Sequence, residues 1–159
     1  MTTTLIQIET ALNSRPLFPL TNDPDDTEAL TPGHFLIGSP LNAIPQEDMS
    51  NRNINSIKRW ELTTKLFQSF WTKWRNEYLN TLQQRPKKYS QKSNHSPKIN
   101  DLVIINDNNI PPNNWLLGRI TAVHPGTDSV TRVVSLKTTN GVLKRPSSKI
   151  CILPIDANP

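Results

Sequence analysis

The sequence predicts an α+β protein in which helices come first along the chain and a small antiparallel sheet comes last. Apolar residues recur at intervals of three and four in two segments before residue 86, which is typical of amphipathic helices. After residue 98, short apolar runs alternate with turn residues, which is typical of strands joined by hairpins. Fourteen prolines against five glycines exclude a single long helical bundle.

The first predicted helix covers residues 4–13, where Leu5, Ile8 and Leu12 fall on one face. It ends before Pro16, because the residue that precedes a proline is disfavoured in the helical region. A helix of about ten residues cannot bury its apolar face by itself. We therefore expect residues 1–53 to be the remnant of a larger core and to be poorly ordered in isolation.

Residues 16–53 carry six prolines and are predicted to form a loop-like strip that wraps a neighbouring core. One short helix is predicted within this strip, at residues 31–38. Thr31 suits its N-cap, Pro32 suits its first position, and Gly38 suits its C-terminal cap.

A long bridging helix is predicted over residues 54–86, ended by Pro86. Aromatic residues at helical spacing are typical of a core or an interface, and stacking platforms for bases are the alternative. A chain this small is not expected to cover all of them, so an exposed apolar patch and self-association are predicted. The predicted interface residues are Trp60, Phe67, Trp71 and Trp74.

A basic linker at residues 87–97 then leads into residues 98–155, where five short strands are predicted. Asn140-Gly141 between two of them is a strong hairpin signal. Five short strands in so few residues are typical of a small antiparallel barrel of the SH3-like or OB type. The predicted strands cover residues 101–106, 115–123, 130–138, 142–144 and 149–153.

The net charge of +5 is distributed unevenly along the chain. Residues 1–57 carry a net charge of −5, residues 58–84 carry +3, and residues 85–159 carry +7. A basic segment of this kind indicates an acidic partner, most commonly nucleic acid, and surface lysines that only maintain solubility are the alternative. Lysines and arginines on adjacent strands bind phosphates without reading the base sequence. The predicted DNA-phosphate contacts are Arg119, Arg132, Lys137, Lys144, Arg145 and Lys149.

The sequence does not indicate a catalytic or metal site. Asp23, Asp25, Asp26 and Glu28 lie in a proline-containing turn, which favours turn and capping roles over a Mg²⁺ site. Cys151 is the single cysteine, so an internal disulfide is excluded, and its apolar strand favours a core thiol. With three scattered histidines, no metal, cofactor or small-molecule substrate is predicted. An intracellular protein is expected, because no signal peptide and no membrane-length apolar segment is visible.

Specific strings in the sequence carry more information than its composition. QIE at 7–9 with ALNSRPL at 11–17, EALTPGHFLIG at 28–38 and FWxKWxxEYL at 70–79 resemble the end of the integrase core of BEL/Pao LTR retrotransposons. WxLGRI at 115–120, HPG at 124–126 and NGVxKRP at 140–146 resemble the domain that follows this core in the same polyproteins. The resemblance covers residues 6–155.

The resemblance implies a non-catalytic role. Integrases of this class hold two divalent metals on an Asp-Asp-Glu triad in an RNase H-like core, and nothing in this sequence, Glu9 included, matches that triad. The implied architecture is a remnant of that core, a bridging helix and a C-terminal SH3-like barrel. The implied function is non-specific DNA binding in support of integration, in the nucleus. A protein-interaction module for integrase self-association or chromatin tethering is the alternative.

Overall fold

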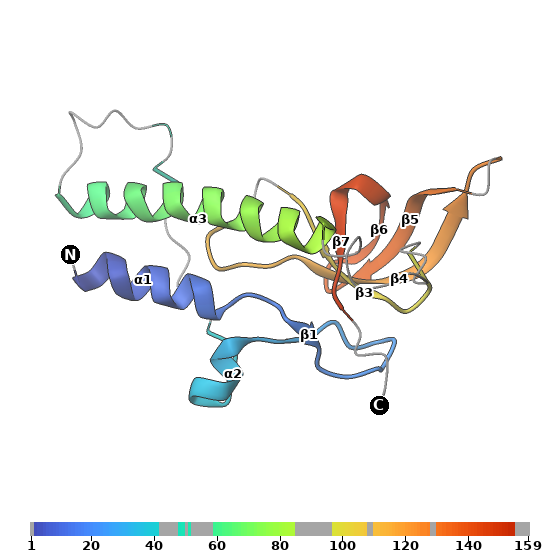
Figure 1. The fold of residues 1–159 in the computed structure, drawn as a ribbon, viewed down its shortest axis with the longest axis horizontal. Helices are drawn as coiled ribbons and strands as arrows, with labels where there is room; N and C mark the ends of the chain where they lie inside the picture. The colour runs from blue at the N-terminus through green and yellow to red at the C-terminus, as the bar shows by residue number, and fades with distance from the viewer. Residues whose placement is uncertain are drawn as a thin grey trace. The chain divides into compact units, whose positions relative to one another are not determined.

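The structure, a computed structural model, describes residues 2–41, 48, 49, 51, 59–84, 97–107, 110–127 and 130–154. It confirms the predicted α+β class: three helices and a five-stranded antiparallel sheet (Figure 1). The chain divides into two compact units, and each unit combines parts of several of the segments predicted at 1–53, 54–86, 87–97 and 98–155. The helical unit comprises Met1–Arg15, Thr31–Tyr78 and Asn109–Asn114, and the sheet unit comprises Pro16–Leu30, Leu79–Asn108 and Trp115–Pro159. The predicted linker at 87–97 lies almost wholly outside the described residues.

The two short helices of the helical unit form where the sequence predicts them. Helix α1 covers Thr2–Asn13, and the Ser14 hydroxyl closes its last turn by donating to the Ala11 carbonyl at 2.9 Å. Helix α2 covers Pro32–Ile37, with Thr31 at its N-cap in an extended conformation. Its C-cap, Gly38, has a φ of 74°, a left-handed conformation that glycine adopts without a Cβ penalty. The predicted capping residues are therefore confirmed.

Helix α3 covers Arg59–Gln84, and its residues up to Tyr78 belong to the helical unit. Buried positions recur along it at intervals of three and four residues, which gives one continuous buried face. The buried Met49 contacts that face, since its backbone N–H donates to the Gln68 side-chain oxygen at 2.9 Å. The buried residues of α3 are Thr64, Phe67, Gln68, Trp71, Arg75, Leu79 and Leu82.

The sheet unit is built on five antiparallel strands in the order β6-β5-β4-β3-β7. All five predicted strands are confirmed, with ends that differ by at most two residues. The Asn140-Gly141 hairpin is confirmed too, because Thr138 pairs with Gly141, whose φ of 118° favours glycine. The strands are β3 Leu102–Ile105, β4 Leu117–Pro125, β5 Thr131–Thr138, β6 Gly141–Pro146 and β7 Ile150–Ile152.

The sheet is strongly curled. Strands β6 and β7 lie at opposite ends of the strand order, yet only a three-residue 3₁₀ turn, Ser147–Lys149, joins them. Four inter-strand spacings in a flat sheet amount to about 19 Å. A 3₁₀ turn that rises about 2 Å per residue cannot span that distance. The described strands β6 and β7 do not pair with each other, so the predicted closed barrel is not confirmed.

Strand β3 is buried on both faces, which explains its unbroken apolar sequence. On one face the sheet buries a core cluster of Val103, Ile105, Ile120, Val134, Leu136 and Ile150. On the other face, the end of α3 contacts β7. The Cys151 thiol donates to the Leu79 carbonyl at 3.7 Å, and the Gln83 side-chain amide donates to the Ile150 carbonyl at 3.4 Å. Cys151 is therefore the core thiol that was predicted.

A small ribbon in the predicted strip was not anticipated. Strands β1 Phe18–Pro19 and β2 Ala29–Leu30 pair antiparallel, and the Leu17 N–H extends the pairing by donating to the Leu30 carbonyl at 2.8 Å. The segment that joins the two strands, residues 20–28, is called the acidic loop below because it contains Asp23, Asp25, Asp26 and Glu28. The acidic loop belongs to the sheet unit and not to the helical unit.

Candidate nucleic-acid interface

The strand register brings three of the six predicted phosphate contacts onto one face of the sheet, namely Arg119, Lys137 and Lys144, of which the two lysines are exposed. Lys144 pairs with Ser135, and Lys137 pairs with Val142, so the two lysines are diagonal neighbours on β5 and β6. They lie on the face opposite the core residues Val134 and Leu136; this is called the outer face below. Both lysines are exposed, with 45% of the Lys137 side chain accessible to solvent.

Three other predicted contacts lie elsewhere. Arg145 pairs with the core residue Val134, and Arg132 is two residues before Val134 on β5, so both belong to the face opposite Lys137 and Lys144. Lys149 is exposed at the end of the 3₁₀ turn between β6 and β7. The predicted set is therefore not one continuous basic surface.

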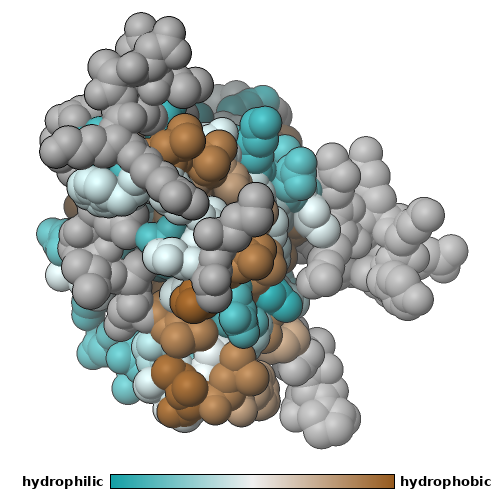
Figure 2. All heavy atoms as spheres, turned by 90° about the vertical axis from the view of Figure 1, so that its left-hand side faces the viewer, coloured by the Kyte–Doolittle hydropathy of each residue, from teal (hydrophilic) through white to brown (hydrophobic). Residues whose placement is uncertain are grey.

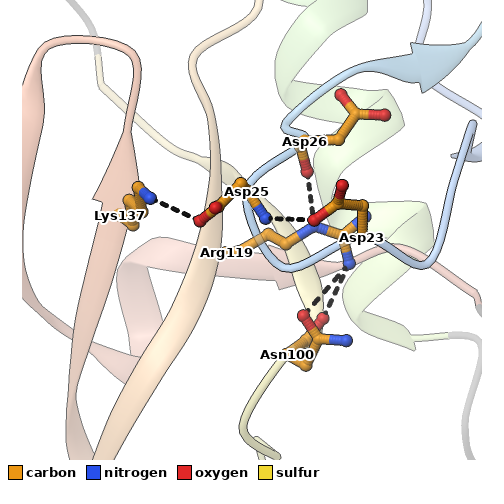
Figure 3. Close-up of polar contacts among 6 residues, drawn as sticks. All are labelled: Asp23, Asp25, Asp26, Asn100, Arg119 and Lys137. Carbon is orange, nitrogen blue, oxygen red and sulfur yellow. Dashed lines mark hydrogen bonds and ion pairs between the residues drawn. The ribbon is translucent and has the colours of Figure 1, made fainter.

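Arg119 is buried and does not fit its predicted role. It pairs with Lys137 across β4 and β5, but only 2% of its surface is exposed. Its guanidinium donates to the backbone carbonyls of Asp26 and Asn100, the latter at 3.0 Å (Figure 3), and to the backbone carbonyl of Thr21. These contacts direct the arginine into the acidic loop, so it is unable to reach a phosphate group in solution. Its role is to fasten the acidic loop to the sheet.

The carboxylates of the acidic loop organise its turns, as was predicted. The Asp25 N–H donates to the Asp23 carboxylate at 2.9 Å, and the Glu28 N–H donates to the Asp26 carboxylate at 2.8 Å. The Thr21 hydroxyl donates to the other oxygen of Asp26 at 2.5 Å. The hydroxyl and the Glu28 N–H lower the pKa of Asp26, and the Arg119 charge adds a smaller effect in the same direction. Among the described residues, no cluster of three potential metal ligands is found.

One carboxylate of the acidic loop reaches the outer face. The Lys137 ammonium lies 2.6 Å from the Asp25 carboxylate and forms an ion pair with it (Figure 3). The hydrogen bond and the charge of Lys137 together lower the pKa of Asp25. Because both side chains are largely exposed, water and salt screen this ion pair.

The rest of the outer face combines polar and apolar groups. The His124 Nε2 lies 2.9 Å from the Ser135 hydroxyl, and the Thr121 hydroxyl donates to the Ser135 carbonyl at 3.2 Å. Val133 and Val142 are exposed beside them. Exposed lysines beside such polar groups can contact a phosphate backbone.

The predicted aromatic interface on α3 needs correction. Phe67 and Trp71 are each only 2% exposed, because they lie on the buried face of the helix. Trp74 is half-buried and stacks with Phe70 and Tyr78, at centroid distances of 6.4 and 5.8 Å. Of the four predicted residues, Trp60 is the exposed one, at 60%.

The exposed apolar surface of the helical unit is made by other residues. Figure 2 shows apolar side chains gathered on the face of the molecule that Figure 1 places at the left. The short helix α2 contributes three consecutive exposed residues to this unit. The exposed large apolar residues of the helical unit are Leu5, Ile6, Phe35, Leu36, Ile37, Trp60 and Leu66.

Two further observations bear on other classes of site. Burial raises the pKa of the Cys151 thiol to about 11, which opposes a nucleophilic role at neutral pH. Within the described ranges, no helix is long and apolar enough to cross a membrane.

Comparison with known proteins identifies the family of this chain. A family model, described as a family of unknown function (DUF5641), matches residues 58–153. The chain belongs to the DUF5641 family. The match runs from the start of α3 to the residue after β7, so the DUF5641 region includes the whole five-stranded sheet. No curated protein and no solved structure matches the chain.

The contact between the acidic loop and the sheet was missed by sequence reasoning. Arg119 and the acidic loop are more than 90 residues apart in the chain. One available signal was the alternation of side chains along β4. Ile120 belongs to the core, so its neighbour Arg119 lies on the other face of the sheet. A second was the excess of acidic residues in a loop that precedes a basic sheet. Neither signal specifies that the arginine binds backbone carbonyls.

Proposed function

We propose that this chain is a non-catalytic part of a BEL/Pao-type retrotransposon integrase and binds DNA without sequence preference through the outer face of its sheet. The sequence strings at 7–38, 70–79 and 115–146 support the integrase assignment through their resemblance to that class. The DUF5641 region contributes the sheet that would carry the DNA contacts.

The strand order supports an SH3-like assignment for this sheet. Each strand pairs with the next along the chain from β3 to β6, and a 3₁₀ turn then returns the chain so that β7 pairs with β3. This arrangement and the curl of the sheet support the SH3-like small barrel that the resemblance implies for this region.

The observation that carries the DNA-binding proposal is that Lys137 and Lys144 are diagonal neighbours on the outer face. Both lysines are exposed, and they are held at neighbouring positions by the β5–β6 hairpin. Clustered ammonium groups neutralise adjacent phosphates and release counterions, which favours binding of any duplex. Ammonium groups on phosphates neutralise charge and do not read base edges, so recognition through the backbone fits best.

Salt dependence of binding to two unrelated duplexes tests this proposal. Each phosphate contact contributes about −0.9 to the slope of log K against log salt concentration. The two duplexes are expected to give equal affinities and equal slopes. The double variant K137M/K144M is expected to weaken binding to both and to make the slope shallower by about two.

A matched control is the double variant R132M/R145M, which removes the same charge from the opposite face. It is expected to change the slope much less than K137M/K144M does. Lys87 and Lys88 provide a second control, since the predicted basic linker could bind DNA by itself. If K87A/K88A abolishes binding while K137M/K144M leaves affinity and slope unchanged, the outer face is not the DNA-binding surface.

A second candidate function, a protein-interaction module, is favoured by the exposed apolar residues of the helical unit. Phe35, Leu36 and Ile37 on α2 are each at least 60% exposed. Exposed apolar residues of this kind commonly mark protein interfaces. Self-association that persists at high salt and is reduced in F35S/I37S, measured by sedimentation, would favour this function over DNA binding.

A further inference from the structure

The acidic loop changes the charge of the unit that contains the outer face. Residues 85–159 carry eleven basic and four acidic residues, a net charge of +7. The sheet unit also includes Pro16–Leu30, which carry four acidic residues and no basic one. The net charge of the sheet unit is therefore +3. The four acidic residues of the loop neutralise more than half of the +7 charge carried by residues 85–159.

The loop is fastened to the sheet by contacts that do not use its carboxylates. Arg119 donates to the backbone carbonyls of Thr21 and Asp26, and the Asn100 side-chain amide donates to the Asn22 carbonyl at 3.3 Å. Asp25 consequently remains available to meet Lys137, and its side chain is 79% exposed. A buried arginine thus holds an exposed carboxylate beside an exposed lysine.

The carboxylate of Asp25 contacts Lys137 in the way that a phosphate oxygen would. Both groups are anionic acceptors that bind an ammonium group at about 2.7–2.9 Å. The Asp25 carboxylate lies 2.6 Å from the Lys137 ammonium, so a phosphate cannot form the same contact until the carboxylate moves away. The ion pair is exposed and weak, so a polyanion with several contacts can displace it.

We propose that Lys137 is a phosphate-binding position of the outer face and that the acidic loop competes with nucleic acid for it through Asp25. This inference rests on the proposed DNA-binding function and adds an internal competitor to it. The loop then sets a threshold for binding. A polyanion that also engages Lys144 and further basic side chains displaces Asp25 from Lys137, whereas an isolated phosphate group does not.

The variant D25N tests this competition in the full chain. It removes the charge that pairs with Lys137 and keeps the size of the side chain, and the turn contact at this position is made by the backbone N–H. Duplex affinity is expected to rise about 5- to 10-fold at 0.1 M salt, because Asp25 no longer has to be displaced from Lys137. The slope of log K against log salt is expected to stay close to that of the unmodified chain, because the number of phosphate contacts in the complex is the same. The matched control is E9Q, which makes the same charge change at an exposed residue of α1 in the helical unit. E9Q is expected to change affinity by less than about twofold.

A second variant shows whether Asp25 acts through Lys137. In the K137M background, D25N is expected to increase duplex affinity no more than E9Q does. The competition is overturned if D25N and E9Q behave alike in the otherwise unmodified chain, or if D25N gives its full gain without Lys137. Binding by the unmodified chain without a gain in D25N overturns the competition alone. Absence of duplex binding by every variant, including D25N, overturns the proposed function.

Discussion

The acidic loop contacts the sheet in two regions that differ in almost every physical respect. At the Arg119 region the cation is buried, and its partners are backbone carbonyls of Thr21, Asp26 and Asn100. At the Lys137 region the cation is exposed, and its partner is a carboxylate that is itself exposed. Arg119 and Lys137 are nonetheless direct neighbours across β4 and β5.

The difference shows how one loop can be held firmly and still leave a charge exchangeable. A buried hydrogen-bonded cation is costly to remove, because its partners lose their donors in a region with little water. An exposed ion pair contributes little to stability, because both charges are well solvated when they separate. The Arg119 region therefore serves structure, and the Lys137 region is available for ligand binding.

Removing Arg119 is expected to have the largest effect on stability. R119M should lower the free energy of unfolding of the sheet unit by about 2–4 kcal/mol, because a buried charged donor group with three carbonyl acceptors is lost. R119K should recover only a small part of this loss, since an ammonium group cannot reproduce the planar fork of the guanidinium. Denaturant unfolding measures both variants. A change in R119M no larger than in K137M would show that the two regions do not differ.

Asn100 supports the Arg119 region, and its replacement is expected to have an intermediate effect. Its φ of 77° is left-handed, which asparagine and glycine tolerate and alanine does not. N100A should lower the free energy of unfolding by about 1–2 kcal/mol through backbone strain and the lost contact to Asn22. N100G relieves the strain but not the lost contact. Equal stabilities of N100A and N100G would contradict the strain argument.

Removing Lys137 is expected to have the smallest effect on stability. K137M should leave the midpoint of denaturant unfolding unchanged within error at neutral pH, because the ion pair is exposed. It should instead raise the pKa of Asp25 toward the usual value of an aspartate, since Lys137 is the main cause of the lowered pKa.

The pH dependence of this ion pair follows from the same shift. Because the pKa of Asp25 is lowered in the folded protein, the small contribution of its ion pair to folding stability is present at neutral pH. This contribution is lost as pH falls through the lowered pKa. NMR titration of the Asp25 carboxyl in the wild type and in K137M measures the shift. An identical pKa in both proteins would show that the ion pair does not form in solution.

Local sequence signals predicted most of the secondary structure. The caps of α2, the Asn-Gly hairpin and the apolar run of β3 each depend on residues within a few positions of one another. The long-range consequences were not predictable in the same way. Nothing near Arg119 in the sequence indicates that it binds carbonyls of the acidic loop.

The aromatic residues of α3 show a second limit of sequence reasoning. Helical spacing correctly indicated that α3 has one apolar face, but it does not tell an interface from a core. Phe67 and Trp71 lie on the buried face, whereas Trp60, in the first turn of α3, is exposed. The six predicted phosphate contacts separated for a related reason, because a one-residue step along a strand reverses the face on which a side chain lies.

The central claim is that the outer face binds the phosphate backbone, and an NMR titration of the full chain with a short duplex tests it most directly. The account predicts that the backbone amide shifts that change most are those of Lys137, Lys144 and the acidic loop, with little change at Arg132 and Arg145. It also predicts the same pattern for a second duplex of unrelated sequence. Shift changes confined to α2 and the start of α3, or to the face of Arg132 and Arg145, would contradict it.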